Sequence, residues 1–162
     1  MTDITHALAT KDQPNATYKA LESLVHETVG IKLFTLMKID RTRGVARRTF
    51  SNQPQAYPTS GEKPLEDNAW TEQVQVRKET FVANSIEEIA AVFSDYELIQ
   101  SLGCESCINV PVVIGGSVVG TLNCLHEADH YTAERVAAAE SLKQAGALAF
   151  LLDAVLEESS HE

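Results

Sequence analysis

Two apolar runs of strand length, joined by a short glycine-rich segment, constrain the fold of this chain more than any other feature. Residues 107–114 read CINVPVVI, and residues 118–125 read VVGTLNCL. The segment between them is Gly115-Gly116-Ser117, which favours a tight turn because glycine adopts positive φ at little cost. The pattern therefore predicts a β-hairpin and, around it, a sheet with mainly antiparallel pairing.

The length of the turn decides which side chains of this hairpin face each other. A two-residue turn places Cys107 opposite Cys124. A three-residue turn instead places Cys107 opposite Leu125 and Asn109 opposite Asn123. Because side chains alternate between the faces of a sheet, the register also decides which residues share a face. Either glycine can supply the positive φ, so the residues alone leave both registers open.

Further strands are expected where apolar and β-branched residues form short runs, at residues 31–39, 45–51 and 80–83. Residues 52–64 contain three prolines and one glycine and are expected to form a loop. Loops of about a dozen residues are uncommon in compact domains and are often functional.

Helices are expected where apolar residues recur three to four positions apart, at residues 17–29, 68–78, 85–102 and 132–156. Gly30 ends the first of them, and Ser85 with Glu88 forms a capping box at the start of the third. The element order is αββαβαββα, which indicates an α/β (α+β) chain with helices at both ends.

Length and charge exclude several classes of protein. The 162 residues are typical of one domain, and the formal net charge of −10 disfavours binding to nucleic acid or to an anionic membrane. No apolar run is long enough to span a bilayer, and the N-terminus lacks a secretory signal pattern. The three cysteines are therefore expected as reduced thiols in a cytoplasmic protein.

Residues 103–125, followed by Tyr131-Thr-Ala-Glu-Arg135 and a long helix, resemble a GAF domain. The resemblance rests on an apolar strand containing Val110-Pro111, the glycine turn, the return strand Val119-Gly120-Thr-Leu-Asn and the aromatic-Thr-x-Glu start of the helix. It covers residues 15–157, with 1–14 as a flexible N-terminus and 158–162 as an acidic tail. No output module accompanies it, so a stand-alone GAF protein is expected.

The resemblance implies a PAS-like fold. Its central sheet is expected to have about five to six strands, mainly antiparallel. The N- and C-terminal helices are expected on one face and a ligand pocket on the other. In GAF domains that bind small polar ligands, positions equivalent to Cys107, Asn123 and Leu125 line one pocket, which favours the three-residue turn.

In that register Asn109 and Asn123 form a facing amide pair in an otherwise apolar pocket. An unsatisfied buried amide costs about 1–3 kcal/mol, so these side chains are expected to bond each other, water or a ligand. A structural pair and a ligand contact both remain open.

Further candidates for the pocket come from the segments expected to close it and from one strand. They are Tyr57, Trp70, Val74, Phe93 and Arg48. For the apolar candidates the alternative is ordinary core packing. Arg48 is expected to reach an anionic ligand, with an exposed strand arginine as the alternative.

The cysteines admit two chemical alternatives, zinc binding and redox catalysis. Cys104, Cys107, Cys124 and His126 converge on zinc only with the two-residue turn, so no metal or other cofactor is expected. A redox C-x-x-C motif needs its first cysteine at a helix N-terminus, whereas Cys104 follows a helix.

The free methionine-(R)-sulfoxide reductases are an enzymatic branch of the GAF family. They use a cysteine seven residues before the position of Cys107, where this chain has Gln100. Their acidic ligand-binding pair falls here on Asn123 and Leu125. The chain is therefore expected not to be an enzyme, with a distantly related thiol-based redox enzyme acting through Cys104 and Cys107 as the alternative.

The last helix predicts a partner surface. Its residues Ala138, Leu142, Ala145, Ala149, Leu152 and Leu156 are spaced 4, 3, 4, 3 and 4 apart, as in a coiled-coil seam. Residues 147–152 are apolar nearly all round, which implies a second contact. We expect a homodimer through the terminal helices, with coverage by the first helix of the same chain as the alternative.

Together these features predict a cytoplasmic sensory or regulatory GAF domain that binds an unidentified small molecule. It is expected to signal through its terminal helices. A pure dimerisation or interaction module is the alternative of a different class.

Overall fold

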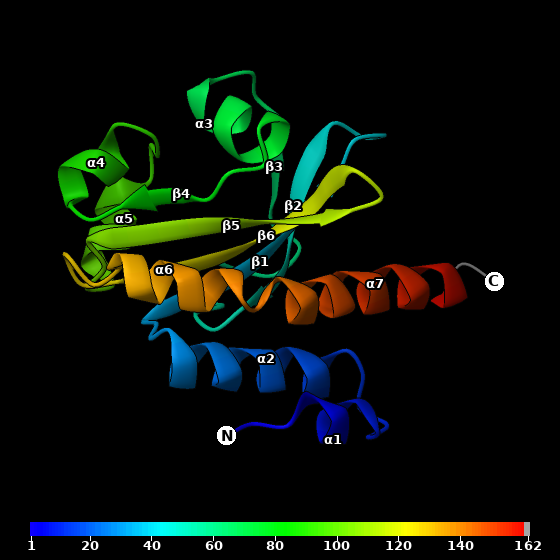
Figure 1. Ribbon diagram of the computed structural model, residues 1–162. Helices are drawn as coiled ribbons and strands as arrows, with labels where there is room; N and C mark the ends of the chain where they lie inside the picture. Colours follow the sequence, from blue (N-terminus) through cyan, green and yellow to red (C-terminus); the bar gives the residue numbers. More distant parts are fainter. Residues whose placement is uncertain (161–162) are drawn as a thin grey trace.

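The computed structural model describes residues 1–160, whose strands form one six-stranded sheet with helices on both faces (Figure 1). Its strand order is β3-β2-β1-β6-β5-β4, and each pair of neighbours is antiparallel. The strands are β1 (Leu33–Asp40), β2 (Val45–Ser51), β3 (Glu62–Pro64), β4 (Phe81–Ala83), β5 (Ser106–Ile114) and β6 (Ser117–His126). The predicted fold class is confirmed.

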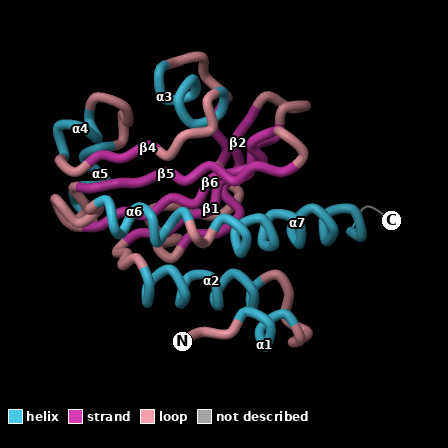
Figure 2. Tube along the Cα trace, in the orientation of Figure 1, coloured by secondary structure: helices cyan, strands magenta, loops and turns pink. Residues whose placement is uncertain are grey.

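The two faces of the sheet carry helices from different parts of the chain (Figure 2). One face, called here the helix face, is covered by α2 (Asn15–Thr28), α6 (Ala133–Glu140) and α7 (Lys143–Ser160), and α1 (Ile4–Leu8) packs on the outer side of α2. The other, called the cavity face, is covered by α3 (Ala69–Thr71), the π-helix η1 (Glu72–Val76), α4 (Ile86–Ala90) and α5 (Tyr96–Ser101). Within residues 1–160, no helix combines the length and apolar character needed to cross a membrane.

The larger core lies on the helix face. Phe34 of β1 and Leu122 of β6 are buried there with residues of α2 and α7. At the closest approach, a Cβ added to Gly120 would lie 2.4 Å from Cζ of Phe150 and 2.5 Å from the carbonyl oxygen of Met37. Glycine at this position therefore lets α7 pack directly on β6.

The β5–β6 hairpin has a two-residue turn. Ile114 pairs with Ser117, so Gly115 and Gly116 alone form the turn, with φ angles of 61° and 82°. Both residues lie in the left-handed region, where glycine avoids the strain of a side chain.

The register farther along the hairpin is nevertheless the one predicted for a three-residue turn. Val119 is an extra residue in β6 that forms a β-bulge and shifts the pairing by one. Cys107 consequently lies opposite Leu125, and Asn109 lies opposite Asn123. The predicted pairs are confirmed, and the predicted three-residue turn is wrong because the bulge supplies the extra residue.

The helix predicted over 85–102 is two helices, α4 and α5, with residues 91–95 between them. The chain turns there toward the cavity face, where Phe93 and Asp95 line the cavity described below. Asp95 stands at the N-cap of α5 without a side-chain capping bond, because its carboxylate accepts a hydrogen bond from Tyr57 instead.

The helix predicted over 132–156 is also divided, into α6 and α7. Its break at Ser141 is stabilised by a bond from the serine hydroxyl to the carbonyl of Ala138. The helix α7 continues through Ser160 and so includes the first residues of the predicted acidic tail, whose last two residues lie outside the described part.

Two segments expected to be irregular contain regular structure. The loop predicted over 52–64 includes β3, which pairs with β2 at the edge of the sheet. The predicted flexible segment 1–14 contains α1, and Thr2 in it donates two hydrogen bonds to the carboxylate of Glu27 at 2.6 and 3.0 Å. Of the helix predicted over 68–78, residues Ala69–Val76 are helical, first as α3 and then as η1.

Candidate ligand-binding site

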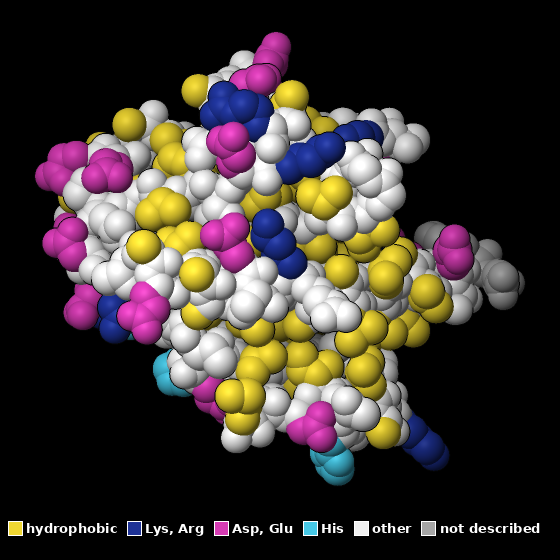
Figure 3. Space-filling model, viewed as in Figure 1, with side chains coloured by type: hydrophobic (Ala, Val, Ile, Leu, Met, Phe, Trp, Pro, Cys, Tyr) yellow, Lys and Arg dark blue, Asp and Glu magenta, His cyan; other side chains and the backbone are white. Residues whose placement is uncertain are grey.

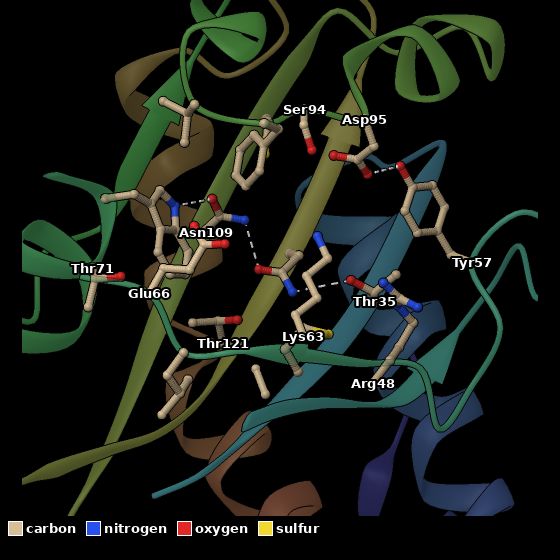
Figure 4. Close-up of a pocket in the computed structure, with 18 of the residues that line it drawn as sticks. Thr35, Arg48, Tyr57, Lys63, Glu66, Thr71, Ser94, Asp95, Asn109 and Thr121 are labelled. Atoms are coloured by element: carbon tan, nitrogen blue, oxygen red, sulfur yellow. Dashed lines mark hydrogen bonds between the residues drawn. The ribbon is translucent and has the colours of Figure 1, made fainter. Parts of the chain in front are cut away.

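A cavity of about 430 Å³ lies between the cavity face of the sheet and the elements that cover it (Figure 4). Its floor consists of side chains from β1, β2, β5 and β6. Its cover consists of Tyr57, β3, the residues 65–68 that follow it, α3, one residue of η1, the segment 92–95 and one residue of α5. Cavities of this size hold small organic molecules.

Eight of the nine predicted site residues line this cavity, namely Arg48, Tyr57, Trp70, Phe93, Cys107, Asn109, Asn123 and Leu125. The ninth, Val74, is fully buried and is not among the lining residues. Gln75, the next residue of η1, lines the cavity instead.

Strand alternation explains why the floor residues share one face. Thr35 of β1 and Asn109 of β5 each pair directly with Asn123 of β6, so the three side chains lie side by side on one face across three strands. The intervening residues, such as Phe34 and Leu122, point to the helix face and belong to the core there.

These polar residues form one continuous hydrogen-bonded row. The Trp70 indole N–H donates to Asn109 Oδ1 at 3.0 Å, and Asn109 Nδ2 donates to Asn123 Oδ1 at 2.7 Å. Asn123 Nδ2 then donates to the Thr35 hydroxyl at 3.2 Å. The amides of Asn109 and Asn123 therefore form the structural pair that was one of the two alternatives left open by the sequence. Each amide nitrogen carries a second hydrogen, so the row retains donors for a further partner.

A second polar group gathers at the β2 side of the cavity. The Tyr57 hydroxyl donates to the Asp95 carboxylate at 2.5 Å, and the guanidinium of Arg48 lies 5.0 Å from the centre of the Tyr57 ring. Burial raises the pKa of Tyr57 well above its usual range, and the hydrogen bond to Asp95 acts in the same direction. The hydroxyl therefore stays protonated and remains a donor. Arg48 is 8% exposed, so the exposed-arginine alternative is wrong.

Several lining residues were not found from the sequence. They include Lys63, Glu66, Asn68, Thr71, Ser94 and Asp95, which lie at the cover of the cavity. Lys63 reaches the cavity from β3, a strand whose sequence EKP has no strand pattern. Ser94-Asp95 is a typical helix start, and that signal could have placed α5 and its first residues.

The cysteines lie on different faces and are buried. Cys107 lines the cavity, whereas Cys124 belongs to the core under the terminal helices. Burial raises the pKa of Cys104 to about 11 and of Cys124 to about 12, and raises that of Cys107 further. Thiols of this kind are poor nucleophiles at neutral pH. Among the described residues, no three His, Cys, Asp or Glu side chains lie together as a metal site.

Solved structures with the same fold include three bacterial GAF proteins. The first is the GAF domain of a two-component sensor histidine kinase from Bacillus halodurans, with a TM-score of 0.66 and 10% identity over 91% of this chain and 98% of that one. The second is the GAF domain from a phosphoenolpyruvate-protein phosphotransferase from Coxiella burnetii, with a TM-score of 0.66 and 16% identity over 98% of this chain and 93% of that one. The third is the GAF domain/HD domain protein from Geobacter sulfurreducens, with a TM-score of 0.67 and 13% identity over 92% of each chain. At these identities the likeness concerns the fold alone.

Sequence comparison extends the likeness to the family. No curated protein matches the chain at a significant level. A family model described as the GAF domain matches residues 15–151. Because this match spans most of the sequence and agrees with the fold, the protein belongs to the GAF domain family.

Proposed function

We propose that this protein is a sensory or regulatory domain that binds a small molecule in the cavity and has no catalytic activity of its own. The observation that carries the proposal is a formed cavity of about 430 Å³ whose apolar wall contains a hydrogen-bonded polar row and a buried cation. A few convergent polar groups in an apolar cavity are typical of ligand sites. Structural relatives described as parts of a sensor kinase and of an HD domain protein agree with a regulatory role.

The absence of catalysis is inferred from the thiols. A redox enzyme acting through Cys104 and Cys107 needs a reactive thiolate, and burial raises the pKa of both thiols. This argues against the redox alternative. A pure interaction module would have no reason to keep a cavity with polar groups aimed into it, and this argues against the other alternative.

Signalling to the terminal helices has a direct route through β1 and β2. Met37 and Arg48 line the cavity, and their neighbours Lys38 and Arg47 point to the helix face. Lys38 lies 3.0 Å from the carboxylate of Asp153 in α7, and Arg47 lies 3.3 Å from it. Both also pair with Glu157. A ligand that prefers one arrangement of these strands would thereby shift the position of α7.

The terminal helices also supply the proposed dimer surface. The predicted seam is used within the chain, since Leu142 and Ala149 are buried in the core with α2. Beside the seam, Leu151 and Val155 of α7 are 50% and 56% exposed. Figure 3 shows hydrophobic side chains along α7 and between α7 and α2. We propose a homodimer through this exposed side of α7, in which movement of the helix is passed to the partner.

Native mass spectrometry of freshly purified protein, compared with the same sample denatured, tests ligand binding. The expected result is a native species with the extra mass of a small molecule that is lost on denaturation. A bare chain that also shows no change in melting temperature with a broad metabolite library would contradict ligand binding.

Analytical ultracentrifugation at micromolar concentration tests the dimer separately. The wild type is expected to sediment as a dimer, and the double variant Leu151→Asp/Val155→Asp as a monomer. Leu98→Asp is the matched control, because Leu98 is a similarly exposed leucine on the cavity face. A monomeric wild type would contradict the dimer.

A further inference from the structure

The Arg48 side chain carries a positive charge that no carboxylate contacts. The residue is 8% exposed, and within residues 1–160 it takes part in no ion pair. Its Nη1 donates to the carbonyl of Pro58 at 3.0 Å. Its Nε is buried and has no hydrogen-bond partner among the described residues. A buried cation without a direct ion-pair partner is costly, so an anion that entered the cavity would be stabilised beside it.

The position of this side chain is set before any ligand binds. The backbone of Arg48 accepts a hydrogen bond from the Ser60 amide at 2.7 Å and donates one to the Gly61 carbonyl at 2.9 Å. A Cβ added to Gly61 would lie 2.8 Å from Arg48 Nη1, so the absence of a side chain there lets the loop close on the guanidinium. Figure 4 shows Arg48 directed into the cavity, near Thr35 and Tyr57. A pre-positioned guanidinium loses little freedom when it binds an anion.

We propose that Arg48 binds the carboxylate of the cavity's ligand, and that this ligand is a small organic monocarboxylate. This inference rests on the proposed function, since it names the class of molecule that the cavity binds. The η nitrogens of the guanidinium, one of which also donates to Pro58, carry N–H groups in a planar fork that suits the two oxygens of a carboxylate.

The other charges of the cavity favour a single negative charge over two. Asp95 lies close enough to interact electrostatically with Arg48, and Glu66 lies at the cover. Lys63 adds one positive charge on the β3 side. Two cations and two anions leave no excess positive charge, so a second negative charge on the ligand adds repulsion from the two carboxylates. A phosphate ester would therefore be repelled more strongly than a carboxylate.

The rest of the cavity suits an uncharged, largely apolar body. Leu33, Met37 and Ile39 of β1 lie along the floor, and Phe93 lies at the cover. At the far end the row from Trp70 to Asn123 offers uncharged donors. A ligand with a carboxylate at the Arg48 end and an aromatic or aliphatic body along the apolar floor therefore fits the cavity.

Acid and amide pairs of the same shape test the proposal in the full chain. Binding of phenylacetate and hexanoate is compared with that of phenylacetamide and hexanamide by calorimetry and by the shift in melting temperature, with phenyl phosphate as the dianion. The acids are expected to bind at least about tenfold more tightly than their amides, which corresponds to one charge-assisted interaction. Phenyl phosphate is expected to bind more weakly than phenylacetate.

Variants of two arginines on the β1–β2 hairpin test whether Arg48 causes the preference for acids over amides. Arg48→Met is expected to lower the affinity for the acids at least about tenfold and to leave that for the amides unchanged. Arg43→Met is the control, because Arg43 pairs with Glu62 and does not line the cavity. Arg48→Lys, which keeps the charge and loses the fork, is expected to fall between. Since the acid–amide comparison uses the wild type, it stands even where a variant fails to fold.

Equal binding of acid and amide, full acid affinity in Arg48→Met, or tighter binding of phenyl phosphate would overturn the inference. If none of the probes binds, the class of ligand is tested instead by identifying the small molecules released from the denatured protein. A released carboxylate would support the inference. A released neutral molecule would overturn it and leave the proposed function standing. If no molecule is released, the charge of the metabolites that raise the melting temperature decides in the same way, and the absence of any such metabolite would overturn both.

Discussion

The helix face and the cavity face belong to the same sheet but are covered in different ways. On the helix face, α2 and α7 are helices of 14 and 18 residues that bury a continuous apolar core. On the cavity face, α4 and α5 have 5 and 6 residues, and the smaller apolar cluster there borders a cavity. We therefore expect the helix face to contribute most of the stability, whereas the cavity face has room for a ligand. Local opening is expected where few apolar contacts hold the cover in place.

Replacing one phenylalanine on each face gives the largest expected difference. Phe34 is fully buried under the terminal helices, whereas Phe93 is half-buried at the cavity. Phe34→Ala is expected to lower the free energy of unfolding by about 3–5 kcal/mol because it leaves a cavity in the main core. Phe93→Ala is expected to cost roughly 1–2 kcal/mol because only part of its surface is buried. Urea unfolding measures both, and equal losses would mean that the two faces contribute alike to stability.

The polar row on the cavity face gives a smaller effect. Asn123→Leu leaves the amide N–H of Asn109 and the hydroxyl of Thr35 without their partners, and is expected to cost about 1–3 kcal/mol. Thr121→Val is the control on the same strand and face, because the Thr121 hydroxyl takes no part in the row.

The double variant Asn109→Leu/Asn123→Leu sharpens this test. It removes both members of the amide pair, so it is expected to cost less than the sum of the two single replacements. Strictly additive losses in urea unfolding would show that the two amides do not depend on each other.

The same contrast between the faces explains what could be predicted from the sequence. The facing of Asn109 and Asn123 followed from alternation and the resemblance to the family, because strand position determines which face a side chain joins. The bulge at Val119 carries no turn residue of its own. It lies next to Gly120, which packs under Phe150. An isolated glycine inside a strand pattern indicates a bulge or a close approach of another segment, but it does not give the residue at which the pairing shifts.

The cover of the cavity was harder to predict than its floor. β3 pairs with β2 at the edge of the sheet, although its residues Glu62–Pro64 have no strand pattern of their own. Before α5, the carboxylate of Asp95 accepts a hydrogen bond from Tyr57 and does not cap the helix, and this contact across the cavity has no local pattern. Short elements that are held by contacts with distant parts of the chain lack the periodicity on which sequence prediction depends.

The buried thiols test whether the cover of the cavity opens independently of the core. Cys107 lies under the cover and Cys124 under the terminal helices, and both are 1% exposed. At pH 8 both are expected to react slowly with iodoacetamide, because burial raises the pKa of each thiol above its unfolded value of about 8.5. Peptide mapping is expected to show Cys107 reacting at least about tenfold faster than Cys124, since opening a cover of short helices costs less than displacing α2 and α7.

The pH dependence of stability follows from the same thiols. A thiol with a raised pKa in the folded state contributes stability that is fully present below the unfolded pKa of about 8.5. That contribution is lost as the pH rises through the folded values, which are about 11 for Cys104 and about 12 for Cys124. The urea midpoint is therefore expected to fall steadily above pH 8.5, and Cys124→Ala is expected to reduce the slope. Equal labelling of Cys107 and Cys124 in native protein, with both rates following the urea midpoint, would instead mean that the cover and the core open together.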